Sequence, residues 1–164
     1  MVSTSLLDRA VVATVPAGRV LLIGTGDEYH HDDAVGPEVI ARLCRAGLAV
    51  AVPVSDGERL RERWRDADVA IVVSAVRADP AHAGRLHTYI TERVAPGPDA
   101  ERDVVNLLTG APRRVVVYEV TGGAFAWGCG LSPTVAETVE LLVAHIADQL
   151  AVHAPTSSAR AGAA

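Results

Sequence analysis

Five segments of the chain have the apolar pattern of β-strands. Residues 19–24 and 69–73 hold continuous apolar runs, which are typical of strands buried on both faces of a sheet. Residues 85–90 alternate between apolar and polar positions, so we expect that strand to be exposed on one face only. Residues 48–54 and 115–120 complete the set of predicted strands.

Segments with helical spacing of apolar positions lie between and after these strands. Residues 37–46 begin with a proline, which suits a first helical turn, and repeat apolar side chains on one face. The other predicted helices span residues 57–66, 101–108 and 133–152. Strands that alternate with helices predict an α/β fold, here a three-layer α/β/α sandwich around a mostly parallel five-stranded sheet with one antiparallel strand.

The pattern divides the chain into one domain with two terminal segments. Residues 1–18 form an N-terminal extension, residues 19–153 a single α/β domain, and the small and polar residues 154–164 a flexible tail. The apolar run at residues 11–15 is too short for the core of a signal peptide. Together with a count of only two cysteines, this predicts a cytoplasmic protein without a disulfide framework.

Composition and charge narrow the classes of function. Hydrophobic residues make up 49% of the 164 residues and charged residues 21%, which is typical of a globular protein. No apolar stretch is long enough to span a bilayer, so we expect no membrane insertion. The net charge of −5 argues against general binding to nucleic acid or to anionic membranes.

Side chains suited to catalysis or metal binding follow three of the predicted strands. They lie in residues 24–33, 74–79 and 121–131. Ligand sites in parallel sheets lie at the carboxyl ends of the strands, where these segments meet. Residues 27–33 hold two histidines and four carboxylates, a mixture that suits Ni, Zn or Fe(II). At most one of the adjacent His30 and His31 is expected to bind an ion. A solvated acidic loop is the alternative interpretation.

A dinucleotide site is disfavoured at the first of these loops. Tyr29 stands where the third glycine of such a motif is needed for close approach to a pyrophosphate. The four carboxylates of the loop would also repel phosphate.

The order of residues in the first loop resembles the opening motif of the hydrogenase maturation endopeptidases. That motif is a strand, Gly-x-Gly, a short variable run, two acidic residues and a further glycine, and this chain has Gly-Thr-Gly, five residues and Asp-Asp-Ala-Val-Gly. Four further segments resemble the family in unbroken order over about residues 20–150. They are Ser-Asp-Gly-Glu at 55–58, Ile-Val-Val-Ser-Ala-Val-Arg at 71–77, Gly-Arg-Leu-His at 84–87 and Gly-Cys-Gly-Leu-Ser-Pro at 128–133.

The resemblance implies an endopeptidase that removes a short C-terminal peptide from the large-subunit precursor of a nickel-iron hydrogenase. It implies no intrinsic cofactor, because the nickel is carried by the substrate. The family is thought to contact that nickel through a first-loop carboxylate, an Asp after the third strand and a later His. These positions fall on Asp33, on Ser74 and within residues 96–103, which contain no histidine.

The metal-contacting residues therefore depart from the family pattern. Ser74 is a neutral hydroxyl, and Asp27 replaces the asparagine of the family's first loop. Supporting or substitute residues come from the neighbouring loops. The candidates are Asp27, His30, His31, Asp32, Ser74, Asp79, His82 and Asp99.

Three hypotheses follow for the function. The chain is an active maturation protease whose missing ligands are replaced, with the group that attacks the peptide bond unassigned. Alternatively, it is a non-catalytic relative that docks a hydrogenase precursor or another partner without proteolysis. A metal- or small-molecule-binding α/β domain of unrelated role is the third hypothesis.

Overall fold

The computed structural model describes residues 10–15, 19–52, 57–92 and 112–153. The predicted helix at 101–108, the tail at 154–164 and the candidate Asp99 lie outside the described residues. Residues 1–9 and 16–18 of the predicted extension lie outside them as well.

A mixed six-stranded sheet forms the centre of the domain, with strand order β3-β1-β2-β4-β6-β5. The strands β2, β4 and β6 are parallel to one another, whereas β1 is antiparallel to β2 and β3, and β5 is antiparallel to β6. Their bounds are β1 Ala10–Thr14, β2 Val20–Thr25, β3 Val50–Val52, β4 Val69–Arg77, β5 Leu86–Glu92 and β6 Arg114–Gly122. The α/β class is confirmed. The sheet has six strands rather than the expected five, and two of them, β1 and β5, are antiparallel rather than one.

The additional strand is β1, which lies within the segment predicted to be an extension. It inserts between β2 and β3, and Val12 is the register partner of both Ile23 and Val52. Val12 and Ala13 are 1% and 0% exposed, so this strand is part of the buried core. The domain therefore includes residues from Ala10 onward. A five-residue run carries little periodicity of its own, and its place depends on pairing with distant strands.

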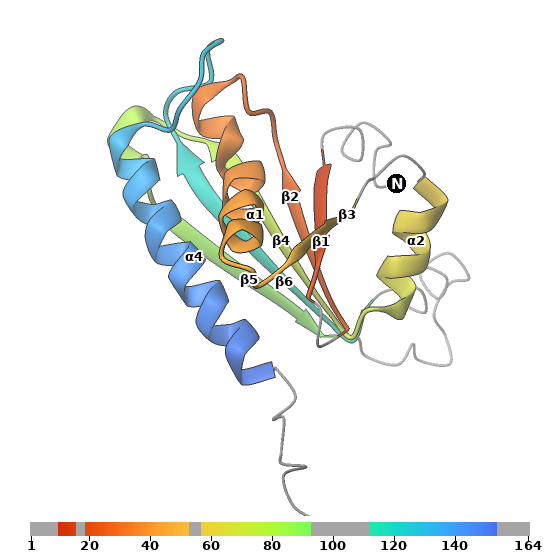
Figure 1. The fold of residues 1–164 in the computed structure, drawn as a ribbon. Coiled ribbons are helices and arrows are strands. Elements are labelled where there is room, and N and C mark those ends of the chain that lie inside the picture. The colour runs from red at the N-terminus through yellow and green to blue at the C-terminus, as the bar shows by residue number, and fades with distance from the viewer. Residues whose placement is uncertain (1–9, 16–18, 53–56, 93–111, 154–164) are drawn as a thin grey trace, which may run out of the picture.

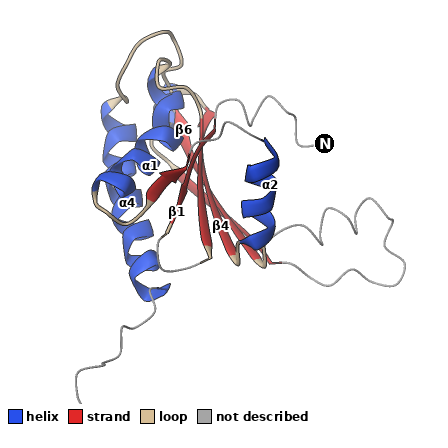
Figure 2. Cartoon of the chain, turned by 45° about the vertical axis from the view of Figure 1, so that its right-hand side comes forward, coloured by secondary structure: helices blue, strands red, loops and turns tan. Residues whose placement is uncertain are grey.

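Three α-helices of the described residues cover the two faces of the sheet (Figures 1 and 2). Helices α1 (Val35–Arg45) and α4 (Pro133–His153) cover one face, and α2 (Gly57–Asp66) covers the other. The larger core lies beneath α1 and α4, where the helices bury Val39, Ile40, Leu43, Val135, Val139, Leu142 and Ile146. A smaller cluster of Val12, Leu21, Ile23 and Ala67 packs on the α2 side with Trp64. The predicted three-layer sandwich is confirmed.

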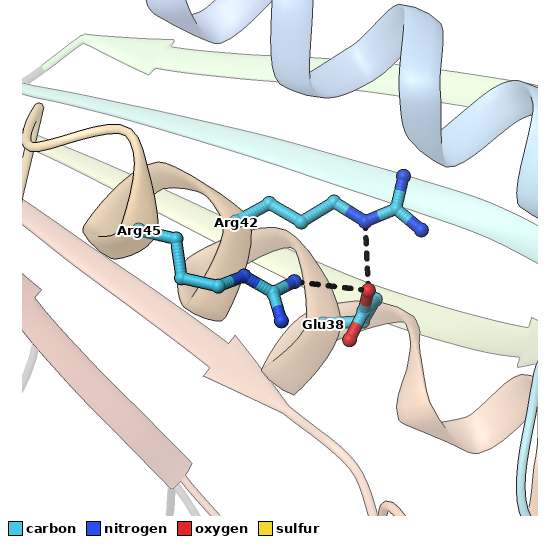
Figure 3. A network of polar contacts seen from close by, with 3 residues as sticks. All are labelled: Glu38, Arg42 and Arg45. Atoms are coloured by element: carbon cyan, nitrogen blue, oxygen red, sulfur yellow. Dashed lines mark hydrogen bonds and ion pairs between the residues drawn. The ribbon is translucent and has the colours of Figure 1, made fainter.

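The outer face of α1 shows why this segment is helical and amphipathic. Glu38 Oε1 accepts hydrogen bonds from Arg42 Nε at 2.7 Å and Arg45 Nη2 at 3.4 Å (Figure 3). The Glu38–Arg42 pair has the spacing at which charged side chains meet on one helix face. Both arginines lie in the last turn, where positive charge interacts favourably with the helix dipole.

Strand β5 differs from its predicted pattern. All seven of its residues are exposed, although the alternation predicted exposure on one face only. It occupies the end of the strand order beyond β6, so one edge of β5 faces away from the described sheet.

None of the helices that the structure describes has the length and apolar character of a membrane span.

The carboxyl edge of the sheet is longer than the sequence predicted. Strand β4 continues beyond Val73 to Arg77, and β6 continues to Gly122 beside it. Gly36 lets the start of α1 approach this edge, because a Cβ atom there would collide with the backbone of Thr25 and Val73. The residues between β2 and α1 are thereby held directly above the ends of the parallel strands.

Candidate functional site

The first loop ends in a 3₁₀ turn at His31–Ala34, which contacts β4 and leads into α1. In Figure 1 this orange segment lies beside the teal loop between β6 and α4, at the upper end of the sheet. The turn presents Asp32 and Asp33 in succession. Their surroundings differ, because Asp32 is buried and Asp33 is only partly buried.

Asp32 is the anchor between the two loops. Its side chain is fully buried and accepts four hydrogen bonds. Oδ2 accepts from the backbone N–H groups of Gly123 and Ala124, both at 2.9 Å, and from the Ser132 hydroxyl at 3.0 Å. Oδ1 accepts from the Ser132 backbone N–H at 2.8 Å. A carboxylate satisfied in this way supports the structure rather than a ligand.

Backbone contacts reinforce this connection. The His31 N–H donates to the Gly128 carbonyl at 2.9 Å, and the Gly128 N–H donates to the Tyr29 carbonyl at 2.8 Å. His31 Nδ1 lies 2.9 Å from the Gly130 carbonyl and donates to it, so this ring is engaged by the second loop. His31 itself has a φ of 46°, in the left-handed region that most side chains avoid. The two loops therefore form one connected unit.

Asp33 lies on the outer side of the same turn and is only partly buried. Its Oδ2 accepts a hydrogen bond from the Asp27 N–H at 3.1 Å, which orients the carboxylate toward the end of β2. Gly26, with a φ of 132°, allows the chain to pass here, because a Cβ atom would collide with the Asp33 carbonyl oxygen. Asp33 therefore differs from its buried neighbour Asp32 in keeping a partly exposed carboxylate of fixed orientation.

Ser74 lies in a polar row that crosses three strands. It is the register partner of Glu119 on β6, and Glu119 is in turn the partner of His87 on β5. Paired residues share a face of the sheet, and alternation from Val72 puts Ser74 on the α2 side. Ser74 and Glu119 are half-buried and His87 is exposed. Sequence reasoning missed Glu119, although a carboxylate within an otherwise apolar strand was a signal that could have found it.

The remaining predicted residues have local partners. His30 Nδ1 lies 3.0 Å from Asp27 Oδ2, although the contact lacks the direction of a hydrogen bond. Asp27 Oδ1 accepts from the Tyr29 N–H at 2.9 Å. Asp79 caps the short 3₁₀ helix Pro80–His82 by accepting from the Ala81 N–H at 2.9 Å. These contacts make Asp27 and Asp79 turn-stabilising residues.

The candidate metal-binding residues lie apart from one another in the described structure. Within the part of the chain that the structure describes, no three His, Cys, Asp or Glu side chains are close enough together to hold a metal ion. Asp33 lies in the turn that contacts β4, and Ser74 and Glu119 are paired between β4 and β6. The hydroxyl and the two carboxylates are oxygen donors of the kind that divalent ions accept.

The rim of the first loop is negatively charged. Glu28 accepts a hydrogen bond from the exposed Tyr29 phenol, and this bond together with its charge raises the pKa of Tyr29 above the ordinary value. Asp27 adds a smaller effect of the same sign on that pKa. The phenol therefore stays neutral and keeps its proton on the oxygen throughout the physiological range.

Comparisons with known proteins identify the fold. No protein-family model and no curated protein sequence matches the chain. Among solved structures, hydrogenase 2 maturation peptidase from Thaumarchaeota archaeon SCGC_AB-539-E09 has a TM-score of 0.58 at 18% identity, covering 80% of this chain and 95% of that one. Hydrogenase maturating endopeptidase HybD from E. coli has a TM-score of 0.57 at 20% identity, with coverages of 81% and 91%.

A third neighbour, the NiFe hydrogenase maturation protease HybD from Thermococcus kodakarensis, has a TM-score of 0.56 at 22% identity, with coverages of 80% and 96%. The likeness therefore extends over nearly the whole of each of these neighbours. The chain has the fold of the hydrogenase maturation proteases, which confirms at the level of fold the resemblance seen in the sequence motifs.

Proposed function

We propose that this chain is a hydrogenase maturation protease-like protein that cleaves or recognises the C-terminal peptide of a nickel-iron hydrogenase large-subunit precursor. The observation that carries the proposal is the fold likeness, which covers 91–96% of the three solved maturation proteases. The five sequence motifs that resemble this family occur in the same order along the same fold.

Asp33 is the residue that we propose to contact the nickel of the precursor. Its carboxylate is an oxygen ligand for a divalent ion, and the hydrogen bond from the Asp27 N–H fixes its orientation. We also propose that the nickel arrives already bound to the substrate, so that the protein has no intrinsic cofactor and nickel is part of what it recognises.

Glu119 is our candidate for the second carboxylate. Ser74 occupies the position at which the family resemblance places an Asp, and a neutral hydroxyl is a weak partner for a divalent ion. Glu119 is paired with Ser74 on the adjacent strand and shares its face of the sheet, so it can supply a negative charge one strand away. The second negative charge of the site would thus be kept, but it would come from β6 rather than from β4.

A non-catalytic docking protein is the second candidate. The observation that favours it is Ser74 itself, because the change from Asp to Ser removes a metal ligand while the fold is retained. In that case the protein binds the precursor and leaves its C-terminal peptide in place. The fold likeness gives no support to a metal- or small-molecule-binding domain of unrelated role.

We also propose that the protein acts in the cytoplasm. Cys44 is half-buried and Cys129 is exposed, and neither forms a disulfide. Free thiols of this kind suit a reducing compartment. A reporter fusion of the full chain that is active in the cytoplasm and inactive after export would support this location.

The deciding experiment measures the intact mass of a nickel-loaded large-subunit precursor before and after incubation with the protein. An active protease removes a C-terminal peptide, and Asp33→Ala abolishes this while the control Asp148→Ala, an exposed position on α4, does not. Co-elution of protein and precursor without a mass change identifies a docking protein. Neither cleavage nor co-elution overturns the proposed function.

A further inference from the structure

Three aromatic rings form an exposed platform beside the candidate site. Trp127 is 76% exposed and stacks on Tyr29, which is 49% exposed, with ring centroids 5.8 Å apart and planes at 14°. The His30 ring meets Trp127 edge-on, with centroids 5.3 Å apart and planes at 87°. We call Tyr29, His30 and Trp127 the aromatic platform.

The platform is held in place by the backbone beneath it. The hydrogen bonds between His31 and Gly128 and between Gly128 and Tyr29 join the two loops that carry the rings. These bonds fix the backbone of the loops, and the ring contacts restrain the side chains, so less conformational freedom is lost when a partner binds. Exposed, pre-organised Tyr and Trp side chains are also the residue types that contribute most to binding at protein interfaces.

The negative charge around the platform favours a positively charged partner. Glu28 is hydrogen-bonded to the Tyr29 phenol, and Asp27 Oδ2 lies 3.0 Å from His30 Nδ1. The faces of aromatic rings attract cations, most strongly the face of Trp. Arg77 lies 4.5 Å over the Phe125 ring, so this cation is engaged by another aromatic side chain.

We propose that the aromatic platform and Glu28 bind an arginine or lysine side chain of a peptide segment in the protein on which this chain acts. The identity of that protein rests on the proposed function, whereas the binding of a cationic side chain rests on the platform alone. A nucleic acid could stack on the same rings, but its phosphates would meet Glu28 and Asp27 on a chain with a net charge of −5.

The test uses the full chain with Trp64→Phe, which leaves Trp127 as its single tryptophan. The probes are blocked Gly-Gly-Arg-Gly-Gly and the same peptide with citrulline, the neutral isostere of arginine. The indole N–H resonance of Trp127 is followed by NMR during each titration. We expect saturable shifts with the arginine peptide and an affinity about two- to fivefold lower for the citrulline peptide, as exposed cation–π contacts give.

Variants separate the parts of the platform. Glu28→Gln should lower the affinity for the arginine peptide and leave that for the citrulline peptide unchanged, whereas Glu137→Gln, an exposed control on α4, should change neither. Trp127→Ala, followed through the Gly128 amide, should abolish binding while the thermal unfolding temperature is retained. Equal affinities for the two peptides, or no shift with either, overturn the platform proposal.

The outcome is independent of proteolysis. If the precursor is processed but neither peptide binds, the proposed function stands and the platform proposal fails. If the arginine peptide binds and the precursor is neither cut nor bound, the platform stands and the proposed partner is wrong.

Discussion

The inner and outer sides of the first loop place two adjacent carboxylates in opposite environments. Asp32 is fully buried and accepts four hydrogen bonds from the loop between β6 and α4. Asp33 is partly buried, and its carboxylate lies toward the turn at the end of β2. The comparison shows that two adjacent Asp residues can differ in role. One holds the two loops together, and the other keeps a partly exposed carboxylate.

The largest effect should come from the inner carboxylate. Asp32→Ala leaves three backbone N–H groups and the Ser132 hydroxyl without their acceptor in a buried position. Since each unsatisfied buried donor costs about 1–3 kcal/mol, we expect a loss of about 3–5 kcal/mol, measured as the free energy of unfolding in urea. Asp32→Asn, which keeps an acceptor, should lose less. A loss below about 1 kcal/mol for Asp32→Ala would contradict the anchoring role.

The outer carboxylate should show the reverse profile. Asp33→Ala removes a carboxylate that is partly exposed and accepts from the Asp27 N–H, so the free energy of unfolding should fall less than for Asp32→Ala, by about 1 kcal/mol. Nickel-dependent processing or co-elution with the precursor should nevertheless be lost. Mass spectrometry and size-exclusion chromatography on the same sample check the functional effect. Retained processing would remove Asp33 from the proposed site.

The charge at Glu119 extends the comparison to the neighbouring strands. Glu119→Gln should reduce nickel-dependent processing or binding by roughly 10- to 100-fold, the usual range for residues that support a metal contact. The double variant Ser74→Asp with Glu119→Gln returns a carboxylate to β4 and should recover most of the loss. Assays with graded nickel loading measure both effects. Full activity of Glu119→Gln alone would show that this carboxylate is not used.

The smallest effect lies at the rim of the outer side. Glu28→Gln removes the hydrogen-bonded charge that raises the pKa of Tyr29, so the phenol of the variant should titrate at lower pH, nearer its ordinary value. NMR of the tyrosine ring carbons resolves Tyr29 from the two other tyrosines during a pH titration. Because Tyr29 is exposed at the surface, the stability of the fold should hardly change. An unchanged pKa would indicate that Glu28 does not contact the phenol.

The sequence predicted those parts of the fold that carry their own periodicity. The strands β2, β4 and β6 begin within continuous apolar runs, and α1, α2 and α4 have apolar positions at helical spacing, so each was located to within a few residues. Strand β1 was missed because Ala10–Thr14 is short and its place is fixed by pairing with β2 and β3. The end of β4 was missed because Ser74 and Arg77 interrupt its apolar pattern.

The sequence predicted that the first loop and the loop after β6 lie together, but not which of their residues make the contacts. The rule that ligands bind at the carboxyl ends of parallel strands located the first loop and the loop after β6. The choice between Asp32 and Asp33 depends on contacts with residues 91–100 positions away, which no local pattern contains. The carboxylate of Glu119 interrupts an apolar run and is visible in the sequence, but only strand register places it beside Ser74.

The hydrogen bonds of Asp32 also bear on the order in which the parts of the protein fold. The groups that donate hydrogen bonds to this carboxylate lie 91–100 residues further along the chain, in the segment that leads into α4. Contacts between such distant residues form late, since they close a long loop of chain. A nascent chain that ends before β6 can form β2 and α1, but its first loop has no anchor. The two loops are therefore joined only after the segment that leads into α4 has been synthesised.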